Sequence, residues 1–425
     1  MSILGQRRYG VLFFLALVLL LNHLAAFADD LSVWRYRVRP GDNLSTLAQN
    51  HLQAPYQWAH VVRFNKLSQA PRILIGQELK IPLAWLKRSP APASLIHVSG
   101  HVQMASTDGI WQFAPAGANL SIGQMLRVGP DSSARIQFAD ASVLLIQPNT
   151  TIVLDTLSVY ANGHMADTTL RLQSGRVEIR ANPHHNTGQQ FEVITPAAVA
   201  AVRGTHFMVL SESNRTIEQT YEGQVIVQSR LAKVLVPKGY GSTVDLGALP
   251  TAPSLIQAMT VTPDFQTKFV ELPIVFSWSA SSENGKSQWV MQLGHDPEVG
   301  DVFREQVSPQ LQANWGALRN GSYYLRFWQL DANGIPSLPK LHPFEVAIAR
   351  KLQGTALQLA NDLFKTGPLE LNLTPLPQGL RYWLELTQDA EGNQVIWQDF
   401  NIQLTLKIPT PPLQEKNHHL WIWTY

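Results

Sequence analysis

Short runs in which apolar and polar residues alternate recur through residues 95–246, and several of them begin directly after a glycine. The clearest are QMLRV after Gly123, RVEI after Gly175, THFMV after Gly204 and QVIV after Gly223. Alternation with a period of two residues indicates a β-strand with one buried face, and glycine supplies the backbone freedom that a bend between strands needs. No helical period longer than two turns occurs in this region. These residues therefore predict an all-β domain.

The first 28 residues predict export. Arg7-Arg8 precedes the apolar run at 11–21, and Ala26-Phe27-Ala28 places small residues at the two positions that define a cleavage site. We expect a signal peptide over residues 1–28, cut before Asp29. The alternative is an uncleaved membrane anchor, because residues 9–28 approach the roughly 20 apolar residues that span a bilayer. Both place the bulk of the chain outside the cytoplasm.

The chain has 425 residues and no cysteine. An exported chain without cysteine has neither a disulfide framework nor a lipid-linked N-terminal cysteine, so packing alone must stabilise its roughly three domains. The formal net charge of +2 comes from Arg7 and Arg8, because 33 basic residues less these two equal the 31 acidic residues. A mature chain without net charge gives no reason to expect binding to nucleic acid.

Residues 33–84 predict a compact βααβ module. A short alternating strand ends at Pro40-Gly41-Asp42, a turn after which Asp42 or Asn43 can cap a helix. Two groups at helical spacing follow, namely Leu44, Leu47, Ala48 and His51, then Trp58, Val61, Val62 and Asn65, before a closing strand at 79–82. We expect Trp58 in the core. With YRVRPGDNLSTLA near its start and IGQELKIP near its end, the module resembles a LysM domain over its whole length.

The LysM resemblance implies a shallow groove that binds glycans containing N-acetylglucosamine. By motif position, its walls are Gly41, Asp42, Asn43, Leu44 and Ser45 on one side and Ile73, Leu74, Ile75 and Gly76 on the other. Main-chain groups would pair with acetamido and hydroxyl groups, while Leu44 and Ile73 would cover the apolar sugar faces. Ile75 stands where the family commonly has proline. The alternatives are a LysM fold without glycan binding, and adhesion through seven basic residues that outnumber two acidic ones in this module.

After a linker at 85–94 that is rich in proline and alanine, residues 95–246 resemble the FecR-type periplasmic domain nearly end to end. The string TPAAVAAVRGTHFMV, at 195–209, is the most characteristic of that family. We interpret its Arg203-Gly204-Thr205-His206 as a structural bend, because no nearby carboxylate or nucleophile motif accompanies His206. Arg203 would bond backbone carbonyls or a carboxylate. The family's regulators carry a cytoplasmic domain, for which the roughly ten residues before the apolar run are too few. The resemblance therefore implies an exported β-scaffold.

Residues 264–348 and 356–425 resemble each other. YWLELTQD at 382–389 repeats the pattern at 289–296, and LWIW at 420–423 repeats that at 325–328. Tyr323 stands where fibronectin type III-like sandwiches carry a corner tyrosine, and Trp278 where they carry a core tryptophan. We expect two such sandwiches, the second lacking its final strand. The resulting edge would pair with a partner or be covered by another segment of this chain.

No pattern in the chain predicts a catalytic or metal site. Cysteine chemistry is impossible, and neither an HExxH zinc motif nor a GxSxG serine elbow occurs. His97 and His101 would stand about 13 Å apart in a strand, too far for one ion. The pairs His184-His185 and His418-His419 are expected at the surface. Because no two of the 31 acidic residues stand out as a glycosidase pair, we expect no catalytic residue, cofactor or metal.

The expected fold is multidomain and mostly β: a small βααβ LysM module, an all-β FecR-type domain and two β-sandwich-like modules. We expect a non-enzymatic protein of the periplasm and cell envelope that binds peptidoglycan glycan strands and presents its β-domains to another envelope protein. The alternatives are an envelope sensor or signalling subunit whose FecR-type domain contacts a membrane partner, and a wall hydrolase with unrecognised carboxylates. No nucleic acid is expected as a partner, and the membrane only if the signal peptide is retained.

Overall fold

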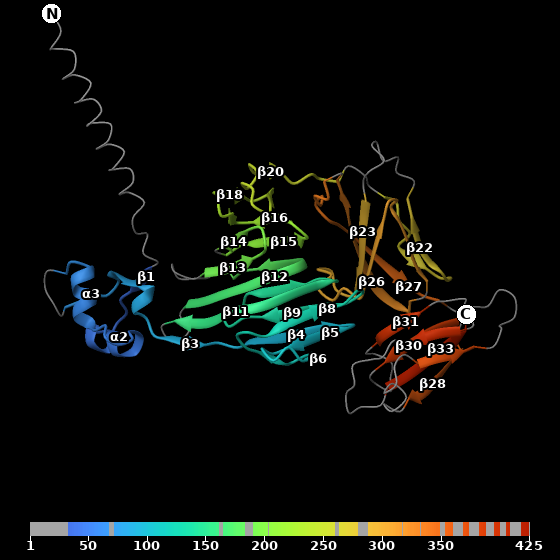
Figure 1. Ribbon diagram of the computed structural model, residues 1–425, viewed down its shortest axis with the longest axis horizontal. Helices are drawn as coiled ribbons and strands as arrows, with labels where there is room; N and C mark the ends of the chain where they lie inside the picture. The colour runs from blue at the N-terminus through green and yellow to red at the C-terminus, as the bar shows by residue number, and fades with distance from the viewer. Residues whose placement is uncertain are drawn as a thin grey trace, which may run out of the picture. The chain divides into compact units, whose positions relative to one another are not determined.

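The computed structural model describes residues 33–67, 72–160, 165–182, 190–202, 204–259, 263–278, 288–316, 318–331, 333–348, 353–359, 369–373, 382–387, 395–399, 405–408 and 418–424. Strands dominate this part of the chain, and its two α-helices lie near the N-terminal end (Figure 1). The expected fold class is confirmed. The expected signal peptide, Arg203 and His184-His185 lie outside the described residues, and within them no helix is long and apolar enough to cross a membrane.

The N-terminal module is a two-stranded antiparallel sheet packed with two helices. Strand β1 (Val33–Arg37) pairs with β2 (Glu78–Pro82), with Trp34 opposite Ile81. Between them in the chain lie α2 (Leu44–His51) and α3 (Trp58–Phe64). Helix α2 begins at that point because the side chain of Asn43 accepts a hydrogen bond from the Thr46 amide at 2.8 Å. The apolar faces of these elements share one buried core.

The compact unit that contains this module also includes Val159, Tyr160 and Met165, which lie far from it in the sequence. Met165 is 1% exposed within the core of the module, and Tyr160 packs against that core. A short 3-10 helix, η1 (Leu83–Trp85), follows β2. The core of the module is therefore completed by side chains from a distant part of the sequence.

The strands that follow form the domain that we call the strand domain. They are β3 (Arg88–Pro90), β4 (Ala93–Ser99), β5 (Val102–Ala105), β6 (Trp111–Phe113), β7 (Asn119–Leu120), β8 (Met125–Val128), β9 (Ser133–Gln137), β10 (Val143–Ile146), β11 (Thr150–Tyr160), β12 (Met165–Arg180), β13 (Gln190–Ile194), β14 (Val199–Val202), β15 (His206–Glu212), β16 (Arg215–Glu222), β17 (Gln224–Gln228), β18 (Lys233–Pro237), β19 (Tyr240–Asp245) and β20 (Ser254–Leu255). Most pairings are antiparallel, and β12 with β13 is parallel. Alternation is clear in β17, where Val225 and Val227 are buried and Ile226 is exposed.

Glycines mark the bends of the strand domain, as their position before alternating runs suggests. Gly123, Gly175, Gly204 and Gly223 all have positive φ, a conformation that other residues rarely adopt. At Gly175, a Cβ atom would also lie 2.3 Å from the side-chain oxygen of Thr150. Because backbone atoms of Thr150 crowd the same point, only glycine fits there.

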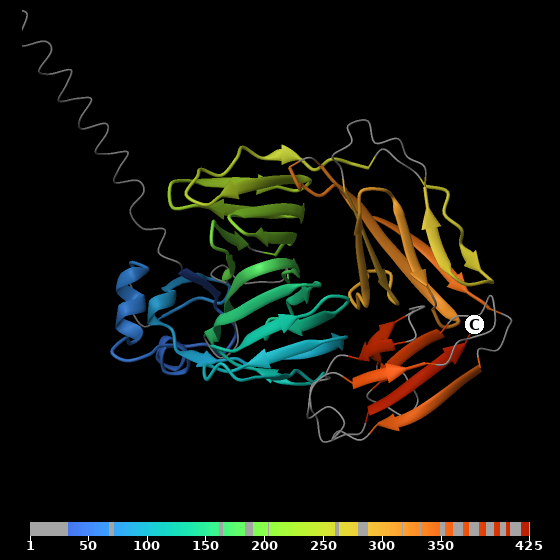
Figure 2. The same cartoon turned by 45° about the vertical axis from the view of Figure 1, so that its right-hand side comes forward.

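The first sandwich consists of β21 (Lys268–Phe269), β22 (Ile274–Ser277), β23 (Gln288–Gly294), β24 (Arg304–Ser308), β25 (Gln312–Gly316), β26 (Gly321–Leu330) and β27 (Lys340–Val346). One sheet has the order β21-β27-β26-β23-β24, and β22 pairs with β25 in the other (Figure 2). Phe276 of β22 and Phe327 of β26 meet in the core that both sheets share. The hydroxyl of Tyr323 donates a hydrogen bond to the carbonyl of Arg319 at 2.9 Å, and Trp278 packs against the core from one side.

The second sandwich consists of β28 (Gln353–Leu359), β29 (Leu369–Asn372), β30 (Tyr382–Thr387), β31 (Val395–Asp399), β32 (Thr405–Ile408) and β33 (His418–Thr424). Its sheets have the orders β28-β33-β30-β31 and β29-β32. Strand β33 pairs with β30 as β26 pairs with β23, and its other side carries β28, antiparallel, where β26 carries β27. The edge expected beside β33 is therefore covered by another segment of this chain.

Candidate functional site

Two loops of the N-terminal module meet beyond the ends of β1 and β2. The amide of Val38 donates a hydrogen bond to the carbonyl of Gln77 at 2.9 Å, and the amide of Gly76 donates one to the carbonyl of Val38 at 2.8 Å. These bonds hold the segment 38–43 against the segment 72–77. The two loops that carry the predicted groove residues therefore start next to each other, at Val38 and at Gly76-Gln77.

The first loop is a rigid turn that leads into α2. Gly41 has a φ of 91°, and a Cβ atom added there would meet nothing within 4 Å, so the conformation alone calls for glycine. The carboxylate of Asp42 accepts hydrogen bonds from the hydroxyl of Tyr36 at 2.5 Å and from the amide of Arg39 at 2.7 Å. Burial, together with the bond to Asp42, raises the pKa of Tyr36 to about 12. Tyr36 therefore remains a neutral donor that fixes the turn.

The second loop is a tight turn that carries two exposed apolar side chains. The amide of Gln77 donates to the carbonyl of Leu74 at 3.0 Å, and the Gln77 side chain accepts from the Leu74 amide at 2.9 Å. Gly76 has a φ of 82°. Leu74 is 66% exposed and Ile75 is 71% exposed. The turn thus presents an apolar tip, and Gln77, which sequence reasoning did not single out, closes it.

One predicted groove residue is used differently. The expectation that the Leu44 side chain covers a sugar face is wrong, because this side chain is 1% exposed and lies in the module's core. Helix α2 begins at Leu44, and its inward face is set by the spacing of Leu44, Leu47 and Ala48. Ile73 is half-buried against the same core, and Ser45 is exposed. The apolar cover of the site comes from Leu74 and Ile75 instead.

The arrangement suits a ligand without charge. The only ionisable side chain among the predicted groove residues is that of Asp42, which already accepts two hydrogen bonds. The groups available to a ligand on these loops are the backbone of the turns, the Ser45 hydroxyl and the exposed aliphatic side chains of Leu74 and Ile75. Such a surface can pair with hydroxyl and amide groups while covering an apolar ring face.

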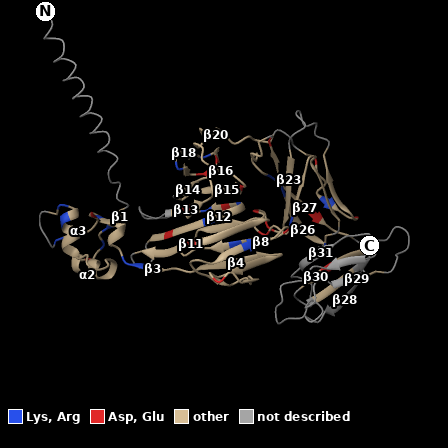
Figure 3. Cartoon of the chain, viewed as in Figure 1, with Lys and Arg blue, Asp and Glu red and all other residues tan. Residues whose placement is uncertain are grey.

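Charged side chains flank the predicted groove residues, since Arg39 and Arg72 are exposed in the same two loops, and further charged and aromatic groups lie on the rest of the module. Figure 3 marks basic positions in blue on α3, where Arg63 lies. Trp58, expected in the core, is 38% exposed at the start of α3, so that expectation is wrong. Trp58 is the first residue of α3, so no earlier turn of the helix covers its side chain. Val61, one turn later, is the residue of α3 that is buried in the core. Tyr56 and Trp85 stack with their ring centroids 5.0 Å apart.

The bend at His206 contains an ion pair that the sequence did not reveal. His206 Nε2 lies 2.7 Å from Glu178 Oε1, so the expectation that no carboxylate lies near His206 is wrong. The partner comes from β12, which pairs with β15 and places Arg180 opposite His206. Burial would raise the pKa of Glu178, but the charge of Arg326 and the hydrogen bond of His206 outweigh it and hold that pKa well below its usual range.

Metal binding finds no support in the described residues. No group of three or more histidine, aspartate or glutamate side chains within them lies close enough together to hold a metal ion. His97 is half-buried, and burial lowers its pKa.

Solved structures with some likeness to the chain come from two organisms. Two are structures of a proposed anti-sigma factor from Parabacteroides distasonis ATCC 8503, at 16% and 15% identity and TM-scores of 0.26 and 0.25, each covering 30% of this chain and 59% of its own. The extracellular domain of a proposed one-component system from B. thetaiotaomicron is 10% identical, with 65% of this chain and 60% of its own covered and a TM-score of 0.15. The chain thus spans about three fifths of their length, and these TM-scores do not define a shared fold.

Two segments match family models, although no curated protein matches the chain. Residues 36–82 match the model described as LysM domain, and residues 124–226 match the model described as FecR protein. The first match spans the paired loops of the module, and the second includes Glu178 and His206. A LysM domain indicates glycan binding, and both kinds of domain are typical of proteins of the cell envelope.

Proposed function

We propose that the chain is a non-enzymatic envelope protein that binds N-acetylglucosamine-containing peptidoglycan glycan through its N-terminal module. Its strand domain and sandwiches then serve as a scaffold for another envelope protein. The glycan site consists of Gly41 to Ser45, through backbone and the Ser45 hydroxyl, and of Ile73 to Gly76. Residues 1–28 act as a signal peptide, which places the mature chain in the periplasm.

The observation that carries this proposal is the pair of loops joined by the bonds between Val38, Gly76 and Gln77. They hold the two turns together, and Leu74 and Ile75 are exposed on the second one. Adjacent exposed aliphatic side chains beside backbone polar groups can cover the apolar face of a sugar ring while the backbone binds its hydroxyl and amide groups. The match of residues 36–82 to the LysM model supports a glycan as that ligand.

Sedimentation of the whole chain with insoluble peptidoglycan tests the site. The N-terminal module has seven basic residues and two acidic ones between 33 and 84, so charge attraction to acidic wall peptides is the competing mechanism. At 1 M salt, exposed charges are screened within about 3 Å, whereas hydrogen bonds and apolar contacts persist. We expect most binding to remain at 1 M salt and to be competed by soluble N-acetylglucosamine oligomers.

Three outcomes would count against the proposal. Loss of sedimentation at high salt, without competition by the oligomers, would assign adhesion to the basic surface. Release of soluble fragments from the peptidoglycan would favour the wall hydrolase. N-terminal sequencing of the envelope-bound protein should return Asp29, and a sequence that begins at Met1 or Ser2 would mean that the signal peptide stays as a membrane anchor.

A second candidate function is that of an envelope sensor or signalling subunit. The match of residues 124–226 to the FecR model favours it. Transcriptome comparison of cells with and without the gene tests it, because a signalling subunit changes the expression of a defined set of genes, whereas a scaffold anchored to the wall does not. An unchanged transcriptome would leave the scaffold as the function.

A further inference from the structure

The strand domain and the first sandwich meet through charged groups that cross the boundary in both directions. Arg176 of β12 pairs with Glu305 of β24, with 2.7 Å between Nη2 and Oε2. In return, Arg326 of β26 pairs with Glu178 of β12, also with 2.7 Å between the atoms. All four side chains are 14% exposed or less. The guanidinium groups of Arg176 and Arg326 lie 4.4 and 5.7 Å from the ring centre of Trp328.

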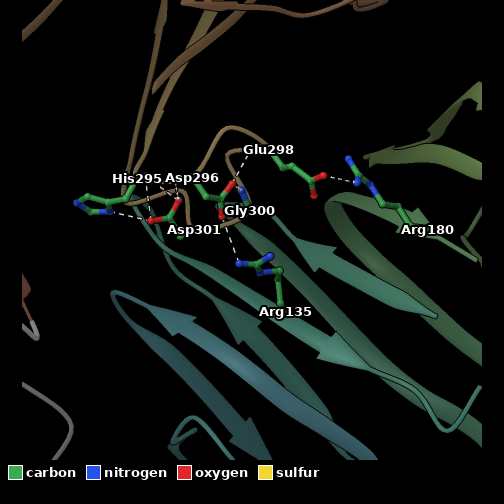
Figure 4. Close-up of polar contacts among 7 residues, drawn as sticks. All are labelled: Arg135, Arg180, His295, Asp296, Glu298, Gly300 and Asp301. Carbon is green, nitrogen blue, oxygen red and sulfur yellow. Dashed lines mark hydrogen bonds and ion pairs between the residues drawn. The ribbon is translucent and has the colours of Figure 1, made fainter. Parts of the chain in front are cut away.

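A second set of pairs lies at the rim of this interface (Figure 4). Arg135 pairs with Asp296 at 3.2 Å and Arg180 with Glu298 at 2.6 Å, and these side chains are about a third to a half exposed. The other oxygen of Asp296 accepts the amides of Glu298 and Gly300, which fixes the acidic loop between β23 and β24. A Cβ atom on Gly300 would lie 3.1 Å from the guanidinium carbon of Arg135, so the loop packs directly on that group.

Apolar packing at the same interface is less extensive than in the core of either domain. The described core residues of the strand domain and those of the first sandwich form two separate clusters. Between them lies a small group in which Met208, Leu210 and Ile217 are buried and Ile335 packs against them. Beside this group the two domains leave a cavity of about 380 Å³, lined by Gly241 on one side and Pro336 on the other.

We propose that the strand domain carries a docking surface for an acidic β-edge, formed by Arg135, Arg176 and Arg180 with Glu178, and that the first sandwich occupies it reversibly. Permanent interfaces resemble a hydrophobic core cut in half, whereas this one is centred on ion pairs and is incompletely filled. Each domain keeps its own core when the two separate, and water can solvate the freed charges. The first sandwich is thus a detachable occupant, and its departure uncovers a basic surface on the strand domain.

This inference goes beyond the proposed function and does not rest on glycan binding. The whole chain can be labelled cleanly, because it contains no cysteine. We would place spin labels on Ile226→Cys of the strand domain and Val270→Cys of the first sandwich, both exposed, and measure the distance distribution between them. At low salt, we expect one narrow distribution for the docked state. At 1 M salt, which screens the exposed rim pair of Arg180 with Glu298, a second and longer distance should appear.

Charge-reversal variants show whether a change in the distance comes from breaking an ion pair or from destabilising a domain. Arg176→Glu should shift the population to the longer distance, and the double variant Arg176→Glu/Glu305→Arg should return it to the short one. Arg180→Glu with Glu298→Arg repeats the test at the more exposed pair of the rim. Arg171→Glu, which breaks an exposed ion pair with Asp155 inside the strand domain, is the matched control and should change nothing.

Two results would overturn the proposal. One is a single narrow distance that neither salt nor the reversals at Arg176 and Arg180 alter, because the docking would then be permanent. The other is a longer distance that the double variants fail to reverse, because the single substitutions would then act by disrupting a domain and not by breaking the pair.

Discussion

Leu44 and Ile75 belong to the same pair of loops and serve opposite purposes. The side chain of Leu44 is 1% exposed in the core, whereas that of Ile75 is 71% exposed at the tip of the second turn. We predict that Ile75→Asp abolishes sedimentation with peptidoglycan but changes the free energy of unfolding of the module by less than about 1 kcal/mol, because exposed substitutions cost little. Leu44→Ala should lower that free energy by about 2 to 5 kcal/mol through the cavity that it leaves.

Circular dichroism melts and sedimentation assays measure these two effects separately. Gln49→Asp, on the exposed face of α2, is the matched control for an added charge and should retain both binding and stability. An Ile75→Asp chain that folds and still sediments like the unchanged chain would contradict the groove assignment.

Glu218 is a carboxyl group buried inside the strand domain. Its side chain is fully buried, and Oε2 has no hydrogen-bond partner among the described residues, whereas Oε1 accepts from Thr220. Burial raises the pKa of Glu218 from 4.5 to about 8, against the opposite effect of the Thr220 bond. Since the folded pKa lies above the unfolded one, the contribution to stability is complete below about pH 4.5 and is lost as the pH rises toward 8.

We therefore predict that Glu218→Gln removes a pH dependence from the stability of the strand domain. Between about pH 4.5 and 8 the unchanged chain should lose up to about 1 kcal/mol per pH unit relative to the variant. Thermal melts of both chains across this range measure the difference. Glu222→Gln, on an exposed position of the same strand, is the control and should leave the slope unchanged. Parallel slopes for Glu218→Gln and the unchanged chain would disprove an ionisable role for Glu218.

Single residues also show what a sequence can and cannot settle. Gly41 and Gly76 could be placed in turns because their neighbours have turn chemistry, and both have positive φ. Leu44 fitted two patterns at once, a helical core face and a groove position, and spacing alone does not choose between them. The pair of Glu178 with His206 could not be foreseen, because it joins residues 28 positions apart through strand register.

At the scale of elements, alternation and glycine position predicted where the strands of the strand domain lie in the sequence. They predicted less well which strands pair with each other. The repeated patterns of the two sandwiches correctly aligned β30 with β23 and β33 with β26, and both pairs adopt the same antiparallel arrangement. The pairing of strand β28 with β33 spans about sixty residues of chain. Local pattern carries no information on such a distant partner.

The role of β28 leads to a prediction about association. It covers the side of β33 that would otherwise be an open edge, a known template for pairing with other chains. Neighbouring residues of a strand direct their amides to opposite sides, so proline at both Ala356 and Leu357 must remove a bond to β33. We expect the double variant to associate with rising concentration and to lose hydrogen-exchange protection in β33.

Light scattering and hydrogen exchange of the whole chain measure both effects. The double variant Ala356→Val/Leu357→Val keeps the amides and is the matched control. If β33 remains protected in the proline variant, β28 does not stabilise this edge.

At the scale of the whole molecule, the chain has several cores. The described core residues of the N-terminal module, the strand domain and the first sandwich form separate clusters. Unfolding of such a chain is not a two-state process, and each core should give its own transition in calorimetry. A substitution in one core should therefore shift one transition only, which allows a buried residue to be assigned to the unit that it stabilises.

Met165 is the best residue for such a test, because the sequence places it in the strand domain and the structure places its side chain in the core of the N-terminal module. It lies on β12, within the segment that matches the FecR model, yet it is 1% exposed in the core of the N-terminal module. We predict that Met165→Ala lowers the free energy of unfolding of the N-terminal module by about 2 to 5 kcal/mol, the usual cost of deleting a buried side chain of this size. The calorimetric transition of the module should shift to a lower temperature.

Leu172→Ala is the matched control, because Leu172 lies on the same strand, is fully buried and belongs to the core of the strand domain. It should shift the transition of the strand domain and leave that of the module unchanged. If Met165→Ala instead shifts the strand-domain transition, the module is complete without Met165. If it shifts the transition of the module, a glycan bound there is held by a unit that includes Met165.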